Sequence, residues 1–196
     1  MNIHIHTKGV QKYNKGFTLV ETLIAVTILA TAVAGTMTIA FQGLRGAQLA
    51  KDELVASYLA QEGVDFIRAW RDQNYLSGLV TSPDDADWVS GLVNGAGGAP
   101  CATANGCTVD MTDPTSAPDI CGGVCNPLTF DPADGLYSQE AAGGTRVNSP
   151  FTRTIRMSSL SANKYHIVTV TMTWQTGPIS RQLVLREVLS NWQSQI

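Results

Sequence analysis

Charged residues are scarce in this sequence, and there is no excess of basic residues. Only 15% of the 196 residues are charged, against about 25% in a typical soluble protein. The formal net charge is −3, from 13 basic and 16 acidic residues, whereas a nucleic-acid-binding surface is strongly basic. Composition therefore disfavours a nucleic-acid partner, although it leaves room for a local basic patch.

Catalytic motifs are missing as well. The chain contains no Walker loop, no GxSxG and no HExxH motif. Two of its three histidines, His4 and His6, lie close to the N-terminus, which leaves His166 alone in the rest of the chain. Because no nucleophile and base occur in a recognisable arrangement, we expect the protein not to be an enzyme.

Proline is absent from residues 1–82, and this region contains a long uncharged run. Residues 22–44 carry no charged side chain, and about 20 apolar residues in a helix span a bilayer. The 16 residues before Phe17 contain three lysines and no acid, whereas acids balance bases directly after the uncharged run. The positive-inside rule predicts a single membrane helix with a cytoplasmic N-terminus and an external C-terminal part. A core helix of a soluble protein is the alternative.

The junction before the uncharged run carries a more specific pattern. The stretch Lys15-Gly16-Phe17-Thr18-Leu19-Val20-Glu21 resembles the processing site of type IV prepilins and of type II secretion pseudopilins. In these families a short basic leader ends in Gly and is followed by Phe-Thr-Leu, an apolar residue, Glu and an apolar helix. The resemblance extends from residue 15 to about residue 41.

The resemblance implies roles for three residues. Prepilin peptidase would cut between Gly16 and Phe17, and the new amine of Phe17 would be N-methylated. Glu21 would pair with that amine on a neighbouring subunit as the helix leaves the membrane for a filament core. From charge alone, Glu21 could instead lie at the headgroup level as an acid at a helix N-terminus. The expected partners are other pilin subunits, prepilin peptidase, the inner-membrane assembly platform and membrane lipid.

The segment after Leu44 keeps a helical pattern but becomes amphipathic. Val55, Leu59, Phe66 and Trp70 share one stripe, which predicts a packing face for a globular head. We expect one continuous helix over residues 17–73. The opposite, charged side is expected to be solvated and includes Lys51, Asp52, Gln61, Asp65, Arg68 and Asp72. Glu62 is assigned to a solvated face too.

The C-terminal part predicts an α+β fold. Residues 77–150 hold seven of the eight prolines and all four cysteines, so we expect a long loop region with at most short strands or helical turns. β-rich segments at 151–158, 165–174 and 179–189 predict an antiparallel meander that covers the helix stripe. The predicted segments are a leader (1–16), a transmembrane and filament-core helix (17–44), an amphipathic helix (45–76), a variable loop region (77–150) and a β-meander (151–196).

The four cysteines lie in the region expected outside the membrane, where an even number indicates disulfides. Pairing of Cys101 with Cys107 and of Cys121 with Cys125 closes the shortest loops and is favoured, because local closure costs the least entropy. The other pairings remain open. A four-cysteine zinc site is the rival, although its spacing differs from the usual C-x2-C.

Asp131, Asp134 and Glu140 offer the oxygen ligands that calcium prefers. Their spacing is not that of an EF-hand, and clusters of Asp, Pro and Gly more often form turns. We therefore expect no cofactor and retain calcium at these residues as a weak alternative.

Together these features predict a structural subunit, similar to a minor pilin, of a type IV pilus-type surface filament. It would reside in the cytoplasmic membrane and then join an extracellular pilus or pseudopilus. One alternative is a pseudopilin of type II secretion. Another is a membrane-tethered extracellular binding or adhesion protein whose 77–150 loops contact a ligand.

Overall fold

A computed structural model describes residues 16–82, 84–94, 98–113, 115–161 and 163–192. The leader predicted at 1–16 lies outside this range except for Gly16. The chain divides into two compact units, one ending at Ala47 and one beginning at Gln48. Each unit is described separately below.

Helix α1 covers Leu19–Leu76 and contributes to both units. Thr18 caps its start, because its hydroxyl oxygen accepts a hydrogen bond from the backbone N–H of Glu21 at 3.2 Å. The helix ends at Leu76, and Gly78 follows two residues later with a φ of +75°, which suits a glycine after a helix C-terminus. The single long helix predicted over residues 17–73 is therefore confirmed, with both ends shifted by two or three residues.

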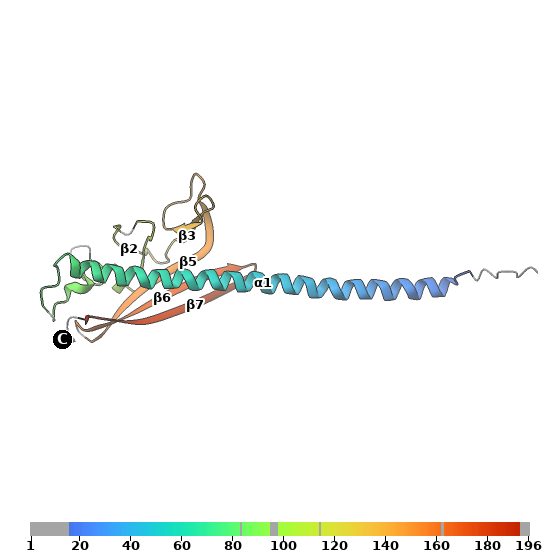
Figure 1. The fold of residues 1–196 in the computed structure, drawn as a ribbon, viewed down its shortest axis with the longest axis horizontal. Coiled ribbons are helices and arrows are strands. Elements are labelled where there is room, and N and C mark those ends of the chain that lie inside the picture. The colour runs from blue at the N-terminus through green and yellow to red at the C-terminus, as the bar shows by residue number, and fades with distance from the viewer. Residues whose placement is uncertain (1–15, 83, 95–97, 114, 162, 193–196) are drawn as a thin grey trace, which may run out of the picture. The chain divides into compact units, whose positions relative to one another are not determined.

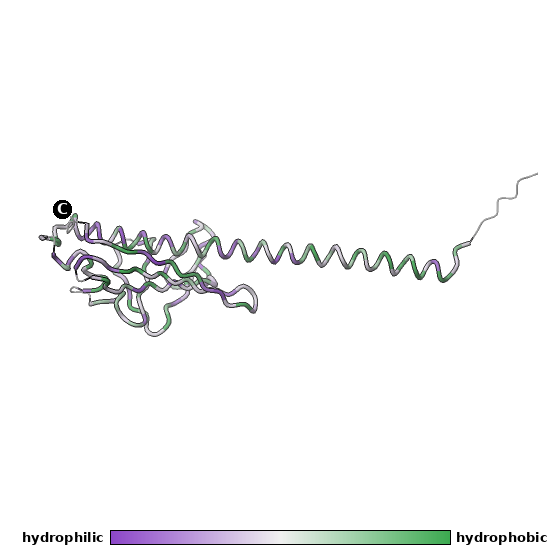
Figure 2. Tube along the Cα trace, turned by 90° about the horizontal axis from the view of Figure 1, so that it is seen from below, coloured by the Kyte–Doolittle hydropathy of each residue, from purple (hydrophilic) through white to green (hydrophobic). Residues whose placement is uncertain are grey.

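In the first unit, α1 is apolar and every residue from Gly16 to Ala47 is exposed. Its threonines donate their hydroxyls to carbonyls three or four residues earlier, as Thr22 does to Leu19 at 2.8 Å. The others that do so are Thr27, Thr31, Thr36 and Thr38. These bonds satisfy the hydroxyls inside the helix and make them compatible with apolar surroundings. By length and composition the helix can cross a membrane, with a mean hydropathy of 2.1 over its most apolar 18-residue window (Figure 2).

The second unit contains a seven-stranded antiparallel sheet beside the remainder of α1 (Figure 1). Its three long strands are β5 (Val147–Ser161), β6 (Tyr165–Thr176) and β7 (Ile179–Ser190), with β6 in the middle. These confirm the predicted meander. The sheet is larger than that meander because residues 77–150 add four short strands.

The short strands extend the sheet beyond β5. They are β1 (Cys107–Thr108), β2 (Asp119–Ile120), β3 (Pro127–Asp131) and β4 (Leu136–Ser138). On the edge opposite β6, β5 pairs with β3 along its first part and with β1 at Ile155. Two short 3-10 helices, η1 (Asp87–Val89) and η2 (Pro100–Ala102), complete the described elements. The region predicted as loops thus has the short strands and helical turns allowed for it, and its strands belong to the main sheet.

Small residues bring α1 close to the sheet. A Cβ atom placed on Gly63 would lie 3.1 Å from Cδ of Arg153 and 3.3 Å from Cδ1 of Ile155. Ala56, Ala60 and Ile67 lie at helical spacing from Gly63, on the same face of α1, and are fully buried. The sheet contributes alternate residues to the same core: Phe151, Ile155 and Met157 of β5, and Val168, Val170, Met172 and Trp174 of β6.

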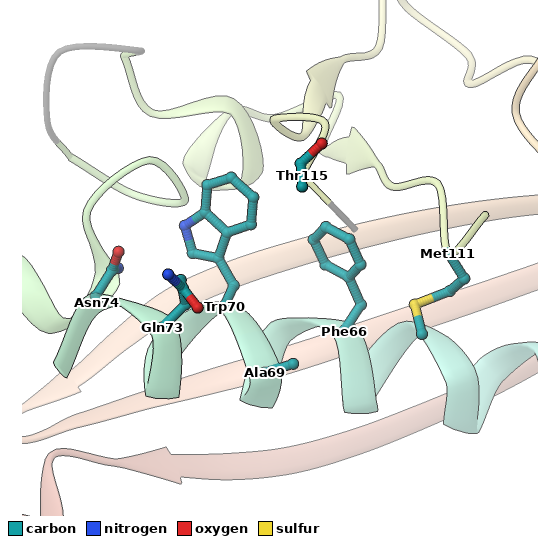
Figure 3. A pocket seen from close by; sticks show the side chains of 7 residues that line it. All are labelled: Phe66, Ala69, Trp70, Gln73, Asn74, Met111 and Thr115. Carbon is teal, nitrogen blue, oxygen red and sulfur yellow. The ribbon is translucent and has the colours of Figure 1, made fainter. Parts of the chain in front are cut away.

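The prediction that the apolar stripe of α1 is covered by the sheet needs a correction, because another face of the helix approaches the sheet most closely. Leu59 and Phe66 are buried, but Val55 and Trp70 are only half-buried. Phe66 and Trp70 point from α1 towards the segment that carries Met111 (Figure 3). The helix is therefore packed on two sides, by the sheet against small residues and by the 77–150 region against the aromatic pair.

Candidate functional site

The junction predicted for processing lies at the start of the described chain. Gly16, Phe17 and Thr18 adopt neither helix nor strand, and α1 begins directly after them. All three are exposed, Phe17 to 80%. The Gly16–Phe17 peptide bond therefore lies in an accessible, non-helical segment, as a site of proteolysis should.

The glycine at this junction is not required by the fold. Of the described atoms, none lies within 4 Å of a Cβ atom placed on Gly16, and its φ is not in the left-handed region. A larger residue would thus fit the chain itself. A requirement for glycine at this position would have to come from a protein that binds the junction.

Glu21 lies in the first turn of α1 and is exposed. Its backbone N–H is bonded to Thr18, and the Thr-x-x-Glu spacing is that of a capping box. Within the described residues its carboxylate makes no hydrogen bond or ion pair. An acid at this position interacts favourably with the helix dipole, and its oxygens are available to a partner from outside the chain.

Residues 11–37 match the family model of the prokaryotic N-terminal methylation motif. The chain has a prepilin-type N-terminus. This motif is the one that marks type IV pilins and pseudopilins for prepilin peptidase. The long helix packed on an antiparallel sheet, with two disulfides, is the α+β arrangement of a pilin-like fold. No curated protein and no solved structure is significantly similar to this prepilin-type chain.

The second unit of the prepilin-type chain, called the head below, contains a buried cation that connects three of its segments. The sequence patterns did not identify this residue. Arg153 is 1% exposed, at an inward position of β5. Its guanidinium donates to the carbonyl oxygens of Leu59 at 3.0 Å and Val109 at 2.8 Å. It also donates to a carboxylate oxygen of Glu62 at 3.0 Å. Arg153 thereby joins α1, β5 and the segment after β1.

Three residues assigned to a solvated helix side have structural partners instead. Glu62 binds Arg153, as described above. Asp52 is 9% exposed and accepts a hydrogen bond from the Thr176 hydroxyl at 2.7 Å, at the β6–β7 turn. Arg68 pairs through two nitrogens with Glu187 of β7, at 2.8 and 2.6 Å. This side of the helix therefore also contacts the sheet. The prediction of a solvated face was wrong for Asp52, which is buried, and for Glu62, which is half-buried, whereas Arg68 remains exposed although it is paired.

Both disulfides of the head have the favoured pairing, Cys101–Cys107 and Cys121–Cys125. The first bond connects η2 to β1, and both of its cysteines are fully buried. The second closes a tight loop directly after β2. All four sulfurs are used in this way, so the four-cysteine zinc alternative is wrong.

The calcium candidates do not come together as a site. Asp131 accepts hydrogen bonds from the Ala133 N–H at 3.0 Å and the Thr145 hydroxyl at 3.0 Å. These bonds and nearby Arg146 hold the pKa of Asp131 below its ordinary value. Glu140 forms an ion pair with Arg146, and the Asp134 carboxylate accepts a hydrogen bond from the backbone N–H of Leu136. In the described parts of the chain, no three His, Cys, Asp or Glu side chains are grouped for a metal ion.

A cavity of about 460 Å³ lies between α1 and the segment that carries Met111 and Thr115 (Figure 3). Phe66 and Trp70 stack in it with ring centroids 5.7 Å apart. Two of the polar groups around it are engaged: the Trp70 indole N–H donates to the Ser90 carbonyl at 2.9 Å, as does the Asn74 amide at 3.0 Å. The cavity is thus mainly apolar, and the polar groups of Trp70 and Asn74 serve the fold.

Proposed function

We propose that this chain is a structural subunit, similar to a minor pilin, of a type IV pilus-type filament. The proposal rests on the matched motif at residues 11–37, which coincides with an accessible junction and an apolar helix. The exposed helix from Leu19 to Ala47 has no covering partner within the first unit. A membrane would cover it before assembly, and the helices of other subunits would cover it afterwards.

The proposed maturation uses three residues. Prepilin peptidase cuts between Gly16 and Phe17, and the new N-terminal amine on Phe17 is methylated. Glu21 then binds the amine of a neighbouring subunit. In the low dielectric of a helix bundle an unpaired carboxylate is costly, and a correctly placed amine offsets that cost. Assembly out of register would leave both charges buried without partners, so the pair fixes the position of each new subunit.

The proposed location is the cytoplasmic membrane, with the N-terminus inside and the head outside. Three lysines precede the helix, and acids balance bases directly after its uncharged part at residues 22–44, which supports this orientation by the positive-inside rule. The two disulfides of the head also suit an oxidising compartment outside the cytoplasm. The role is structural rather than catalytic.

Two substitutions test the proposal in cells that assemble the filament. With Gly16→Leu the chain should remain a full-length precursor on a gel, whereas Gly43→Leu, at a glycine with equally open surroundings, should be cut normally. With Glu21→Ala the chain should be cut and retained in the membrane but absent from purified filaments. Glu53→Ala, an exposed acid further along α1, is the matched control and should assemble.

Mass spectrometry of purified filaments separates this function from its alternatives. A cleaved, methylated N-terminus at Phe17 in pilus filaments supports the proposal. Recovery of the chain only with secretion machinery would favour a type II secretion pseudopilin. A cleaved chain that stays monomeric in the membrane would favour a tethered binding protein. Normal filament incorporation of Glu21→Ala would contradict the register role of Glu21.

A further inference from the structure

One edge of the sheet in the head is long, regular and unpaired. Strand β7 pairs with β6 along all 12 of its residues without a register shift, and no other described strand pairs with it. Its second side therefore presents a row of backbone N–H and C=O groups that another strand can meet. Proteins often protect such an edge with a bulge, a proline or a very short strand, and β7 has none of these three. Val184 and Val188 of β7 are 47% and 54% exposed.

The β7 edge also carries positive charge that the chain does not compensate. Arg181 and Arg186 lie on this strand, and neither takes part in an ion pair of the described chain. Arg186 is exposed. The one acid of the strand, Glu187, is already paired with Arg68 of α1 at 2.6 Å. The edge is therefore basic.

The opposite edge of the same sheet is formed by β2 and β4 and is acidic. Asp119 of β2 is exposed, and its carboxylate makes no hydrogen bond or ion pair with a described residue. Asp134, directly before β4, is exposed as well and uses one carboxylate oxygen for the N–H of Leu136 at 2.9 Å. Both carboxylates can accept from a cation outside the chain.

This separation of charge extends over the whole head beyond α1. Residues 77–146 contain nine acidic residues and one base, whereas residues 147–190 contain five bases and one acid. The one base of the acidic region, Arg146, is already paired with Asp131 and Glu140. The two edges of the sheet are thus complementary in charge to each other, which makes a second copy of this chain a fitting partner.

The strands at the two edges run in the same direction. Every pairing between β7 and β4, through β6, β5 and β3, is antiparallel, and the same holds for β2 through β1. β4 and β2 are therefore both parallel to β7. The head part of α1 runs this way too, because Asp52 binds Thr176 just before β7 and Arg68 binds Glu187 near its end. Continuing the sheet from one head into the next, with strands parallel, keeps the helices of both copies pointing the same way.

We propose that the β7 edge of one head docks against the β2–β4 edge of a second copy of this chain, so that the arginines of β7 face Asp119 and Asp134. The contact joins two different surfaces and leaves one edge free at each end, so it can repeat along an open assembly. It deepens the proposed filament function by adding a contact between heads, and rests on that function only for its place in a filament. Surface charges govern the choice of partner and its orientation more than the affinity.

The test measures self-association of the full chain in a zwitterionic detergent, with micelles in excess over chains. In sedimentation velocity the unaltered chain should associate at about 0.01 M salt and dissociate at about 1 M salt, where surface charges are screened. Arg186→Glu and Asp119→Lys should each weaken association about 10-fold or more, because like charges then face each other. Glu53→Lys, at an exposed acid that belongs to neither edge, should associate like the unaltered chain.

A mixture of the two edge variants decides the pairing. Arg186→Glu chains have two acidic edges and Asp119→Lys chains have a basic edge in place of the acidic one, so equal amounts of both should associate again. A mixture that stays dissociated, or association that persists in both single variants, would overturn the proposal. Glu21→Ala should associate normally, since the contact lies in the head. Its failure to do so would overturn the head contact, whereas the filament function is judged separately from incorporation into filaments.

Photo-crosslinking locates the contact. With benzoylphenylalanine in place of Val184, irradiation at low salt should join two chains, and mass spectrometry should find the partner peptide at β2 or β4. The same group in place of Leu54, a residue of α1 that is 56% exposed, should give no such product. Cross-links from position 184 to β7 of the second chain would show an antiparallel pairing of like edges and would contradict the proposed contact.

Discussion

The polar side chains of α1 have different hydrogen-bond partners in the two units. In the first unit the threonine hydroxyls of α1 bond to carbonyls of their own helix, such as Thr31 to Ile28 at 2.9 Å. In the second unit polar side chains of α1 reach other elements, such as Asn74 to the Ser90 carbonyl at 3.0 Å. A helix whose polar groups are satisfied internally can exchange lipid for protein neighbours, whereas one bonded to a head is committed to it.

The same contrast holds for the glycines of α1. A Cβ atom on Gly35, Gly43 or Gly46 would meet no described atom within 4 Å, whereas one on Gly63 would touch Arg153, Ile155 and Val170. Glycines in the first unit therefore cost helix propensity without a packing reason in the isolated chain. In the second unit, Gly63 lets the sheet approach. The predictions below test this division between a region with internal partners and a region that lacks them.

The largest effect is expected from removal of the buried cation. Arg153→Met leaves the Glu62 carboxylate and the carbonyls of Leu59 and Val109 without their shared donor. We expect a loss of about 3 kcal/mol in the free energy of unfolding of the head, at the lower end of the usual range because Glu62 is partly solvated. Urea unfolding followed by tryptophan fluorescence measures it.

Arg156→Met is the matched control for this experiment. Arg156 lies on the same strand but on its exposed face, so its replacement should change the free energy of unfolding by no more than about 0.5 kcal/mol. Equal effects of the two variants would mean that burial of Arg153 contributes nothing specific to the head.

The next largest loss of head stability is expected when a glycine of α1 is replaced by leucine in the second unit but not in the first. Gly63→Leu forces a side chain into the contact with Arg153 and Ile155, and should cost about 1–3 kcal/mol of head stability through overpacking. Gly46→Leu has open space around it and should leave unfolding of the head unchanged. Denaturant unfolding of both variants is the measurement, and a head equally weakened by Gly46→Leu would contradict the separation of the units.

The disulfides should matter to the head and not to the first unit. Replacing Cys101 and Cys107 together by Ala should cost about 2 kcal/mol, because the closed loop is short and short loops restrict the unfolded chain least. Thermal unfolding of the head reports the loss, and membrane retention, which depends on the apolar helix, should not change. A chain that leaves the membrane when this disulfide is removed would show that the head controls anchoring.

Much of the fold follows from local patterns. The uncharged run predicts the long helix, and alternation of Val168, Val170, Met172 and Trp174 predicts the inward face of β6. The junction at Gly16 and Phe17 is contiguous in sequence and is recognised as a whole. The favoured disulfides are also local, with separations of 6 and 4 residues.

What could not be predicted depends on distant partners. Arg153 occupies an inward position of β5, but its acceptors Leu59 and Val109 are 94 and 44 residues away. Nothing in the local sequence identifies such partners. For the same reason Asp52, which binds Thr176 124 residues later, was assigned to a solvated face. For Arg153 the one available signal was its position on β5, because a cation on the apolar face of a strand needs a buried partner.

The smallest effect is a pH dependence confined to the head. His166 is the sole histidine among the described residues; the residue is 8% exposed, and its ring packs edge-to-face with Trp88, with ring centroids 5.3 Å apart. Burial lowers its pKa below the ordinary value, whereas the unfolded chain should keep a pKa of about 6.5. Below that pH the unfolded chain binds the proton more readily than the folded head. Stability should therefore be greatest above about pH 6.5 and should fall as the pH drops towards the folded pKa.

Unfolding midpoints measured between about pH 5 and pH 7.5 test this dependence, because carboxyl groups titrate mainly below that range. Asp85, near Trp88 in the sequence, has a pKa held below its ordinary value by the N–H groups of Thr81 and Asp87, so it stays charged throughout. His166→Gln should flatten the profile in this range. A slope that persists in His166→Gln would assign the pH dependence to another group. A flat profile in the unaltered chain would mean that His166 ionises as readily in the folded head as in the unfolded chain.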